Sequence, residues 1–332
     1  MKRLSVFILS LILIFSLAAC GKNTPVESEP PAEEKTTLRV GAVTGPQAMG
    51  LAKLMSDSDA GTAANSYEFS LDSDAGELAK KLAGGELDIA ALPTDTAAGL
   101  YETTDGAVQV IAADVLGGLY LAQRGGSVTE ISQLRGKTVC VYGQSKLPAY
   151  VLKCLLKREG IDPQKDVAIK YCDEISQVMN YISSHKDWLA VLPEPVLTAA
   201  QSRESELRVA VNLNEAWKTL SGGSAIVSGA VAVNREFLAR YPQQTAKFLE
   251  EYTLSQQYLG SDSENAAEFI AGYELTATPQ TALSAIPGCG AGLVTGEEME
   301  KLVGSFVTEL FDLDPKAVGG ALPDGDFYGG TQ

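Results

Sequence analysis

Short apolar runs alternate with helical patterns along the first half of the chain. Residues 38–43, 67–71 and 87–92 are runs of strand length. One helical pattern over about 47–55 and another that ends at Gly84 separate them. Alternation of strand and helix is typical of a parallel sheet that helices cover on both faces. We therefore predict an α/β lobe here.

The same pattern begins again after Gly136. Residues 138–141, 167–171 and 188–192 are predicted strands, and residues 147–158 are a predicted amphipathic helix. The buried stripe of this helix consists of Leu147, Val151, Leu152, Leu155 and Leu156. The two halves share a pattern but no clean sequence repeat. They indicate two lobes of similar layout.

The chain then returns toward its first half. Residues 225–233 are predicted as a long strand, residues 235–260 as helices, and everything beyond about 271 as helices and loops. A chain that leaves one lobe and returns needs two crossovers, which we place near 114–124 and 222–230. The predicted divisions are lobe I at 37–119 and 223–312, lobe II at 120–222, and a C-terminal tail at 313–332. The predicted fold is α/β, each lobe a mostly parallel sheet flanked by helices, with two crossover strands as a hinge.

The N-terminal segment has the pattern of an export signal. Lys2 and Arg3 precede an apolar run that is too short to span a bilayer and that ends in small residues. The segment Leu-Ala-Ala-Cys-Gly, with its cysteine at Cys20, resembles the bacterial lipobox. This resemblance implies a signal peptide at 1–19 and a palmitate-type lipid anchor on Cys20, on the extracytoplasmic face of the cell membrane. The alternative is a conventional signal peptide with an incidental cysteine.

Composition and charge restrict the partners of the folded body. The chain has 332 residues, 45% of them hydrophobic and 20% charged, which fits about two globular domains and excludes a multi-span membrane protein. Its formal charge of −16 disfavours nucleic acid or an anionic bilayer surface as a partner. Residues 20–36 are rich in Pro and Glu with almost nothing to bury, so we predict a flexible stalk. We expect the body to be a monomer.

The cysteine and histidine content limits the chemistry of the chain. The four cysteines beyond the lipobox are candidates for buried thiols or for disulfides, and their positions in predicted strands and helices favour thiols. These residues are Cys140, Cys154, Cys172 and Cys289. The single histidine, His185, excludes a multi-histidine metal site, and its position predicts an exposed turn. We expect no metal and no cofactor.

Four short segments, in order, carry a family resemblance: residues 85–90, 134–139, 160–163 and 192–195. They are similar to landmarks of the solute-binding proteins of ABC importers, in the nitrate/sulfonate/taurine and thiamine-pyrimidine branch with the periplasmic binding protein type 2 fold. The resemblance covers about residues 38–310. It implies two lobes that close on a small molecule and deliver it to a membrane permease.

Two other functions remain open on the same scaffold. The branch includes pyrimidine synthases, but these use an active-site histidine and a Cys-rich motif. The chain has only His185 and no cysteine cluster, which argues against an enzyme. A tethered ligand sensor has no sequence feature that separates it from an importer component.

Ligands of open α/β sheets bind beyond the carboxyl ends of the strands, near helix N-termini. Three loops meet this description, and each is otherwise an ordinary helix start or N-cap. The candidate ligand contacts in them are Thr44, Gly45, Pro46 and Gln47 in the first, Thr94 and Asp95 in the second, and Tyr142, Gln144 and Ser145 in the third. Lys146 follows the third loop and is predicted to be solvated.

Two further carboxylates complete the candidate site. Asp114 stands among apolar residues near a predicted crossover, and a charge there needs a partner or a cleft. Glu194 lies between two prolines and is either a ligand contact or a solvated loop carboxylate. The site has acidic groups and few cations, so we predict a neutral or cationic polar ligand, such as an aminopyrimidine-like compound. An anion such as a sulfonate, held by helix N-termini, is the alternative. Trp188 is predicted as core, and Trp217 as either core or a ligand platform.

Overall fold

The computed structural model describes residues 36–329. The predicted signal peptide, Cys20 and almost all of the predicted stalk lie outside these residues. The first sheet has six strands in the order β11-β4-β10-β3-β1-β2. Their bounds are β1 Thr37–Val43, β2 Ser66–Asp72, β3 Ile89–Pro93, β4 Val108–Leu116, β10 Val227–Asn234 and β11 Ala291–Val294.

The second sheet has five strands in the order β7-β6-β8-β5-β9. Their bounds are β5 Leu119–Arg124, β6 Thr138–Tyr142, β7 Ala168–Cys172, β8 Leu189–Pro193 and β9 Leu207–Asn212. We call each sheet with its helices the first and second lobe. Both sheets are mixed rather than mostly parallel. The reason is that the strands next to the crossovers run antiparallel to their neighbours: β10 to β3 and β4, and β5 to β8 and β9.

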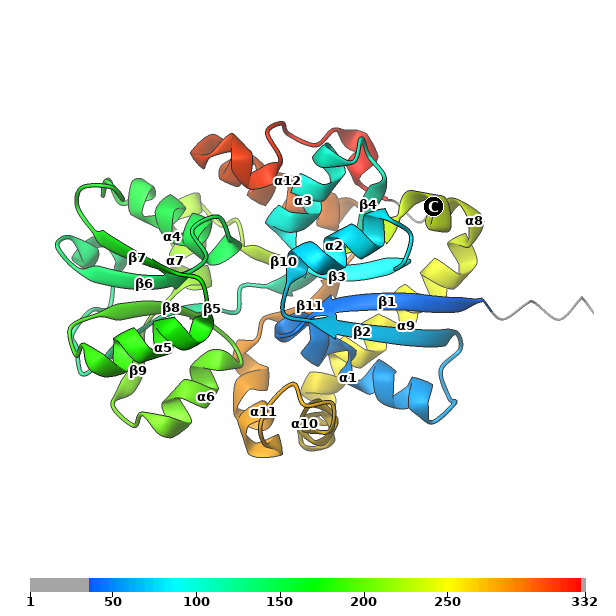
Figure 1. Ribbon diagram of the computed structural model, residues 1–332, viewed down its shortest axis with the longest axis horizontal. Helices are drawn as coiled ribbons and strands as arrows, with labels where there is room; N and C mark the ends of the chain where they lie inside the picture. The colour runs from blue at the N-terminus through cyan, green and yellow to red at the C-terminus, as the bar shows by residue number, and fades with distance from the viewer. Residues whose placement is uncertain (1–35, 330–332) are drawn as a thin grey trace, which may run out of the picture. The chain divides into compact units, whose positions relative to one another are not determined.

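Helices cover both faces of each sheet (Figure 1). In the first lobe they are α1 Pro46–Asp59, α2 Ala75–Ala83, α3 Thr94–Thr103, α8 Arg235–Arg240, α9 Pro242–Ser261, α10 Ser263–Gly272, α11 Pro279–Ala285 and α12 Gly296–Leu313. In the second they are α4 Leu147–Arg158, α5 Ile175–Ser184, α6 Val196–Arg203 and α7 Leu213–Ser221. The five residues of the predicted stripe of α4 are all buried. Short 3-10 helices are Ile131–Leu134, Ile286–Gly288, Pro315–Val318 and Gly325–Phe327.

The chain crosses between the sheets twice. The first crossing is the pair Gly117–Gly118 between β4 and β5, and the second is the segment between α7 and β10. Gly117 and Gly118 have φ of 98° and 71°, a region that disfavours other residues. Both crossings fall within the two regions predicted from the sequence, and the α/β architecture with two lobes is confirmed.

One prediction about the C-terminal part was wrong in detail. The segment beyond 271 is not only helical, because β11 pairs with β4 at the edge of the first sheet. The segment predicted as a tail packs back on this lobe, with Val318 and Phe327 fully buried and Tyr328 bridged to Val110. The fold therefore uses the chain almost to its end.

The structure shows which of the cysteine and tryptophan side chains are buried in the cores. All four cysteines among the described residues are buried and unpaired, as the sequence favoured. Trp217 is fully buried and packs against Phe306, so it is a core residue and not a ligand platform. Trp188 is only partly buried and stacks on the exposed His185. Within residues 36–329 we find no helix with the length and hydropathy required to cross a membrane.

Candidate functional site

Asp114 lies at a β-bulge near the end of β4. Its two neighbours pair with Gly229 and Ala230 of β10, so Asp114 is an additional residue between successive pairs. Bulges redirect side chains and are common next to functional sites. The Asp114 side chain is fully buried. Its Oδ2 accepts a hydrogen bond of 2.9 Å from the Tyr252 hydroxyl, whereas Oδ1 has no partner among the described residues.

Gly229 provides the space for this carboxylate. A Cβ at position 229 would lie 2.3 Å from Oδ1 of Asp114 and 3.1 Å from Nε2 of Gln47. Any side chain there would collide with the carboxylate. The other amide atom of Gln47, Oε1, is 3.9 Å from the Cβ position of Gly45. The Gln47 side chain therefore extends from the part-exposed turn before α1 to the buried carboxylate.

Helix α9 supplies the other polar side chains near Asp114. Nε2 of Gln256 donates to the main-chain oxygen of Asp114 over 3.2 Å, and its Oε1 has no partner within residues 36–329. Gln256 is 6% exposed and Tyr252 is fully buried. Nε2 of Gln256 lies only 2.6 Å from the position that a Cβ of Gly50 would take. The glycine in α1 thus allows α9 to approach closely.

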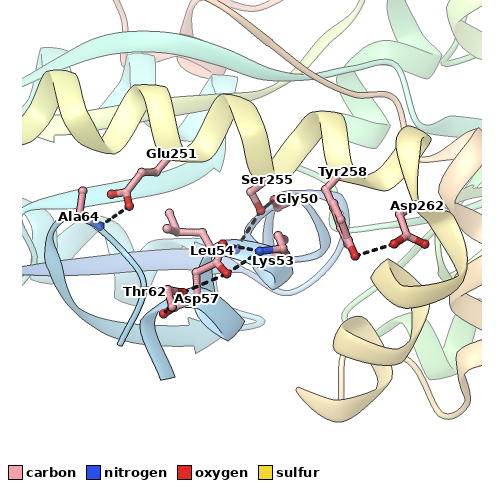
Figure 2. Close-up of polar contacts among 10 residues, drawn as sticks. All are labelled: Gly50, Lys53, Leu54, Asp57, Thr62, Ala64, Glu251, Ser255, Tyr258 and Asp262. Atoms are coloured by element: carbon pink, nitrogen blue, oxygen red, sulfur yellow. Dashed lines mark hydrogen bonds and ion pairs between the residues drawn. The ribbon is translucent and has the colours of Figure 1, made fainter. Parts of the chain in front are cut away.

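Ser255 fixes the position of α9 on α1. Its hydroxyl donates to the carbonyl of Gly50 over 2.6 Å and accepts from the amide of Leu54 over 3.1 Å (Figure 2). These two backbone groups pair with each other in a regular helix, so the serine inserts into the hydrogen-bond ladder of α1. Tyr252 and Gln256 flank Ser255 on the same buried face and are held by this contact.

Burial controls the protonation of Asp114 and Tyr252. It raises the pKa of Asp114 to about 7, against the hydrogen bond from Tyr252, which favours the carboxylate. The pKa of the Tyr252 hydroxyl is well above its usual value, because of burial and of the neighbouring Asp114 charge. Tyr252 is therefore a fixed donor, and the carboxyl group is the part that titrates.

Thr94 and Asp95 form the second part of the candidate site, at the start of α3. Pro93, the last residue of β3, pairs with Gly229 of β10, and β10 pairs with β4 on its other side. Strand β10 therefore separates the start of α3 from the Asp114 bulge. Oδ1 of Asp95 accepts the N–H of Thr96 over 2.8 Å. Burial raises the pKa of Asp95 to about 6, against this hydrogen bond and the positive charge of Lys146 at the start of α4 in the second lobe. Thr94 does not cap α3, and its buried hydroxyl has no partner among the described residues.

Glu194 forms the third part and is not the solvated loop carboxylate that one prediction allowed. It is 5% exposed, and its carboxylate accepts the N–H and the hydroxyl of Thr198 in the first turn of α6, both over 3.1 Å. Burial raises its pKa. Oε1 is 3.2 Å from the Cβ position of Gly288, whose carbonyl accepts the Tyr120 hydroxyl over 2.8 Å. Glu194 thus lies where the second lobe contacts the loop after α11.

The structure does not bring the remaining predicted ligand contacts together with Asp114, Asp95 or Glu194. Thr44, Gln144 and Ser145 are exposed, and Ser145 does not cap α4. Tyr142 is half-buried and packs on the core of the second sheet. Pro46 is the first residue of α1, as expected for an ordinary helix start. Gly45 is its N-cap residue.

Sequence reasoning missed Tyr252 and Gln256. The signal that could have identified them is a polar residue in an apolar stripe, because Phe248, Tyr252, Gln256 and Leu259 recur at helical spacing and are all buried. A buried glutamine in such a stripe needs hydrogen-bond partners.

A protein-family model for menaquinone biosynthesis (VitK2_biosynth) matches residues 41–310, which is most of the chain. The chain belongs to the menaquinone biosynthesis family. No curated protein is similar enough in sequence to count as a relative.

Solved structures with the fold of this menaquinone biosynthesis family member include components of importers. An ABC transporter from Parabacteroides distasonis has 23% identity and a TM-score of 0.74, covering 90% of this chain and 100% of the other. The periplasmic aliphatic sulphonate-binding protein SsuA from Escherichia coli has 13% identity and a TM-score of 0.68, covering 86% and 90%. A ligand-binding component of an ABC-type import system from Staphylococcus aureus, with zinc bound, has 13% identity and a TM-score of 0.66, covering 89% and 97%.

The arrangement in this family member is suited to binding donors of hydrogen bonds. Asp114, Asp95 and Glu194 are buried carboxyl groups with raised pKa. Among the described residues no three His, Cys, Asp or Glu side chains come together as a metal site. These groups can accept hydrogen bonds, and Asp114 and Asp95, with pKa values of about 7 and about 6, can exchange a proton near neutral pH.

Proposed function

We propose that the chain is a lipid-anchored, extracytoplasmic solute-binding protein of an ABC importer that closes its lobes on a small polar molecule. The observation that carries this proposal is the set of buried side-chain oxygen atoms without partners in the described chain: Oδ1 of Asp114, Oε1 of Gln256 and Oγ1 of Thr94. Buried polar groups without hydrogen bonds are costly, and a ligand that supplies partners removes the cost. The fold shared with the Parabacteroides distasonis ABC transporter supports the same role.

The charges around these atoms favour a neutral or cationic solute, such as an aminopyrimidine-like compound. An anion beside the buried carboxyl groups of Asp95 and Asp114 costs several kcal/mol. Among the described residues, Lys146 is the cation that lowers the pKa of Asp95. The fold shared with SsuA favours the alternative, a sulfonate held by helix N-termini. The carboxyl groups of Asp95 and Asp114 favour binding of a cationic or hydrogen-bond-donating solute and disfavour binding of a sulfonate. Substitution of these two residues therefore distinguishes the two ligand classes.

The test is a thermal-shift screen of the purified protein against metabolite pools, followed by calorimetry with each hit. A ligand at a hundred times its Kd adds about 2.7 kcal/mol of stability. We expect Asp95→Ala and Asp114→Ala each to weaken binding at least about tenfold. The exposed Asp187→Ala serves as the matched control. Taurine, alkanesulfonates and nitrate should not bind, and micromolar sulfonate binding that survives both substitutions overturns the assignment.

Attachment to the membrane is tested on the full chain. A diacylated Cys20 is the feature that would hold so acidic a chain at a membrane. Cys20→Ser should move the protein from the membrane fraction to the soluble fraction of cells, and retention of this variant would contradict the lipid anchor. Genes for a permease and an ATPase beside this one would favour an importer over a tethered sensor.

An enzyme is the second candidate, because the chain belongs to a menaquinone biosynthesis family. One observation favours it: the carboxyl group of Asp114 has a pKa of about 7, which suits a general acid or base at neutral pH. Mass spectrometry of each hit after incubation with the protein distinguishes the candidates. A binding protein returns the hit unchanged, whereas an enzyme converts it, and Asp114→Asn then abolishes the conversion.

A further inference from the structure

We propose that Gln47, Asp114 and Gln256 form a subsite for a protonated amidine or amino group of the solute, with the Asp114 carboxylate as its counter-ion. This inference rests on the proposed solute-binding function and specifies which part of the solute is recognised. It assigns roles to Gln256 and Tyr252, which no sequence motif indicated.

The first argument is the number of free acceptors. Oδ1 of Asp114 and Oε1 of Gln256 are both buried and have no partner among residues 36–329. The Gln256 side chain is held at Asp114, because its Nε2 donates to the main-chain oxygen of Asp114. A group with two or more N–H donors can supply partners for both acceptors, and a protonated amidine has four N–H donors. An anionic group would bring only further acceptors.

The second argument is the electrostatic environment of Asp114. The groups that alter its pKa are its burial, the Tyr252 hydroxyl and its own backbone, with no cation among them. A buried carboxylate without a counter-ion is unfavourable. The positive group of a solute would provide the counter-ion that the described chain lacks.

The third argument is pre-organisation. The buried Gln47 amide lies between the part-exposed Gly45 turn and the carboxylate, with Oε1 3.9 Å from the Cβ position of Gly45 and Nε2 3.1 Å from that of Gly229. Gly229 leaves room for Oδ1 where any Cβ would collide with it. Tyr252 binds Oδ2 and leaves Oδ1 for the solute, and it acts as a positioning residue. The subsite is therefore held in place before the solute arrives.

The experiment uses four small probes: the planar acetamidinium, acetamide and acetate, which have nearly the same shape, and the tetrahedral anion methanesulfonate. Their binding to the full protein is measured by saturation-transfer NMR titration. We expect acetamidinium to bind in the millimolar range, acetamide more weakly, and the two anions not at all. Asp114→Asn, which keeps the shape and the acceptor for Tyr252, should weaken acetamidinium binding at least about tenfold. Gln256→Met should weaken it less, and the control Asp187→Asn should not change it.

Three results would overturn the subsite. They are no binding of acetamidinium, equal binding of acetate or methanesulfonate, and acetamidinium binding that Asp114→Asn leaves unchanged. If Asp114→Asn does not unfold cooperatively, Gln256→Met and Gln47→Met replace it as the deciding variants. Failure of the subsite differs from failure of the proposed function. A solute from the thermal-shift screen that binds independently of Asp114 refutes only the subsite, whereas the absence of any solute refutes both.

Discussion

A buried carboxyl group such as that of Asp114 makes the stability of the folded chain depend on pH. Its pKa is about 7 in the fold against an ordinary value of 3.8. The folded chain therefore holds this proton more tightly than the unfolded chain does. Folding takes up a proton between about pH 4 and 7, and the free energy of unfolding falls as the pH rises through this range. Asp95, with a pKa of about 6, acts in the same direction.

We predict that Asp114→Asn flattens this pH dependence. The neutral asparagine keeps the acceptor for Tyr252 and has no charge to bury. Each pH unit between the two pKa values corresponds to about 1.4 kcal/mol, so the wild type should lose a few kcal/mol that the variant retains. Urea unfolding of the protein without ligand, across about pH 4 to 8, measures the difference. The exposed Asp187→Asn is the control, and parallel curves for wild type and Asp114→Asn would contradict the prediction.

The candidate carboxylates could be found from the sequence, but their partners could not. Asp114 interrupts an apolar run, and this is visible in the chain itself. Tyr252 and Gln256 reach it from a helix that is distant in sequence, and their contact depends on how α9 packs on α1. The same limit applies to Glu194. The sequence left a ligand contact and a solvated loop carboxylate open, and the burial of this carboxylate depends on its hydrogen bonds with Thr198 of α6 and on the packing of Gly288 against it.

At the scale of elements, the contact between α1 and α9 holds the site together. Gly50 permits the close approach, and Ser255 joins the carbonyl of Gly50 to the amide of Leu54. Both bonds are buried, so losing them leaves polar groups without partners. Tyr252 lies about one turn of α9 before Ser255, and Gln256 is the next residue after it. The helix pair therefore couples stability to the geometry of the site.

We predict that Ser255→Ala destabilises the protein by about 1–3 kcal/mol. It should also weaken binding of acetamidinium, because Tyr252 and Gln256 lose their fixed position. The control is Thr253→Ala, whose hydroxyl bonds only a carbonyl of its own helix. Urea unfolding and the NMR titration are the measurements. A loss no larger than that of the control would show that, without the serine hydroxyl, the amide of Leu54 bonds directly to the carbonyl of Gly50 within α1.

At the scale of the whole described chain, the alternation of strands and helices was enough to predict two lobes and two crossovers. Local pattern was not enough for β11, a short strand that exists because β4 offers it an edge. It was also not enough for the segment after α12, where Phe327 is buried by packing on Tyr101. Both elements depend on contacts that form only after the first sheet is complete.

The two crossovers are connected through Asn214 on α7. Oδ1 of Asn214 accepts the amide of Ile226 in the second crossover over 3.1 Å. In the first crossover, a Cβ at Gly117 would lie 2.9 Å from the Asn214 side chain. The Ser228 hydroxyl donates to the carbonyl of Gly117 and connects β10 to the same point. Movement of one lobe against the other therefore involves both crossovers together.

We predict that Gly117→Ala destabilises the protein more than Gly125→Ala does. Both glycines have positive φ, of 98° and 64°, so each substitution carries a backbone cost of about 1–2 kcal/mol. Only at Gly117 does the new Cβ meet Asn214, whereas nothing lies within 4 Å of the same position at Gly125. Urea unfolding measures both losses. In a double-mutant cycle, Asn214→Ala should partly offset the loss at Gly117 and leave that at Gly125 unchanged. Equal losses for the two glycine variants would show that Asn214 moves aside freely and that the crossovers are not coupled through it.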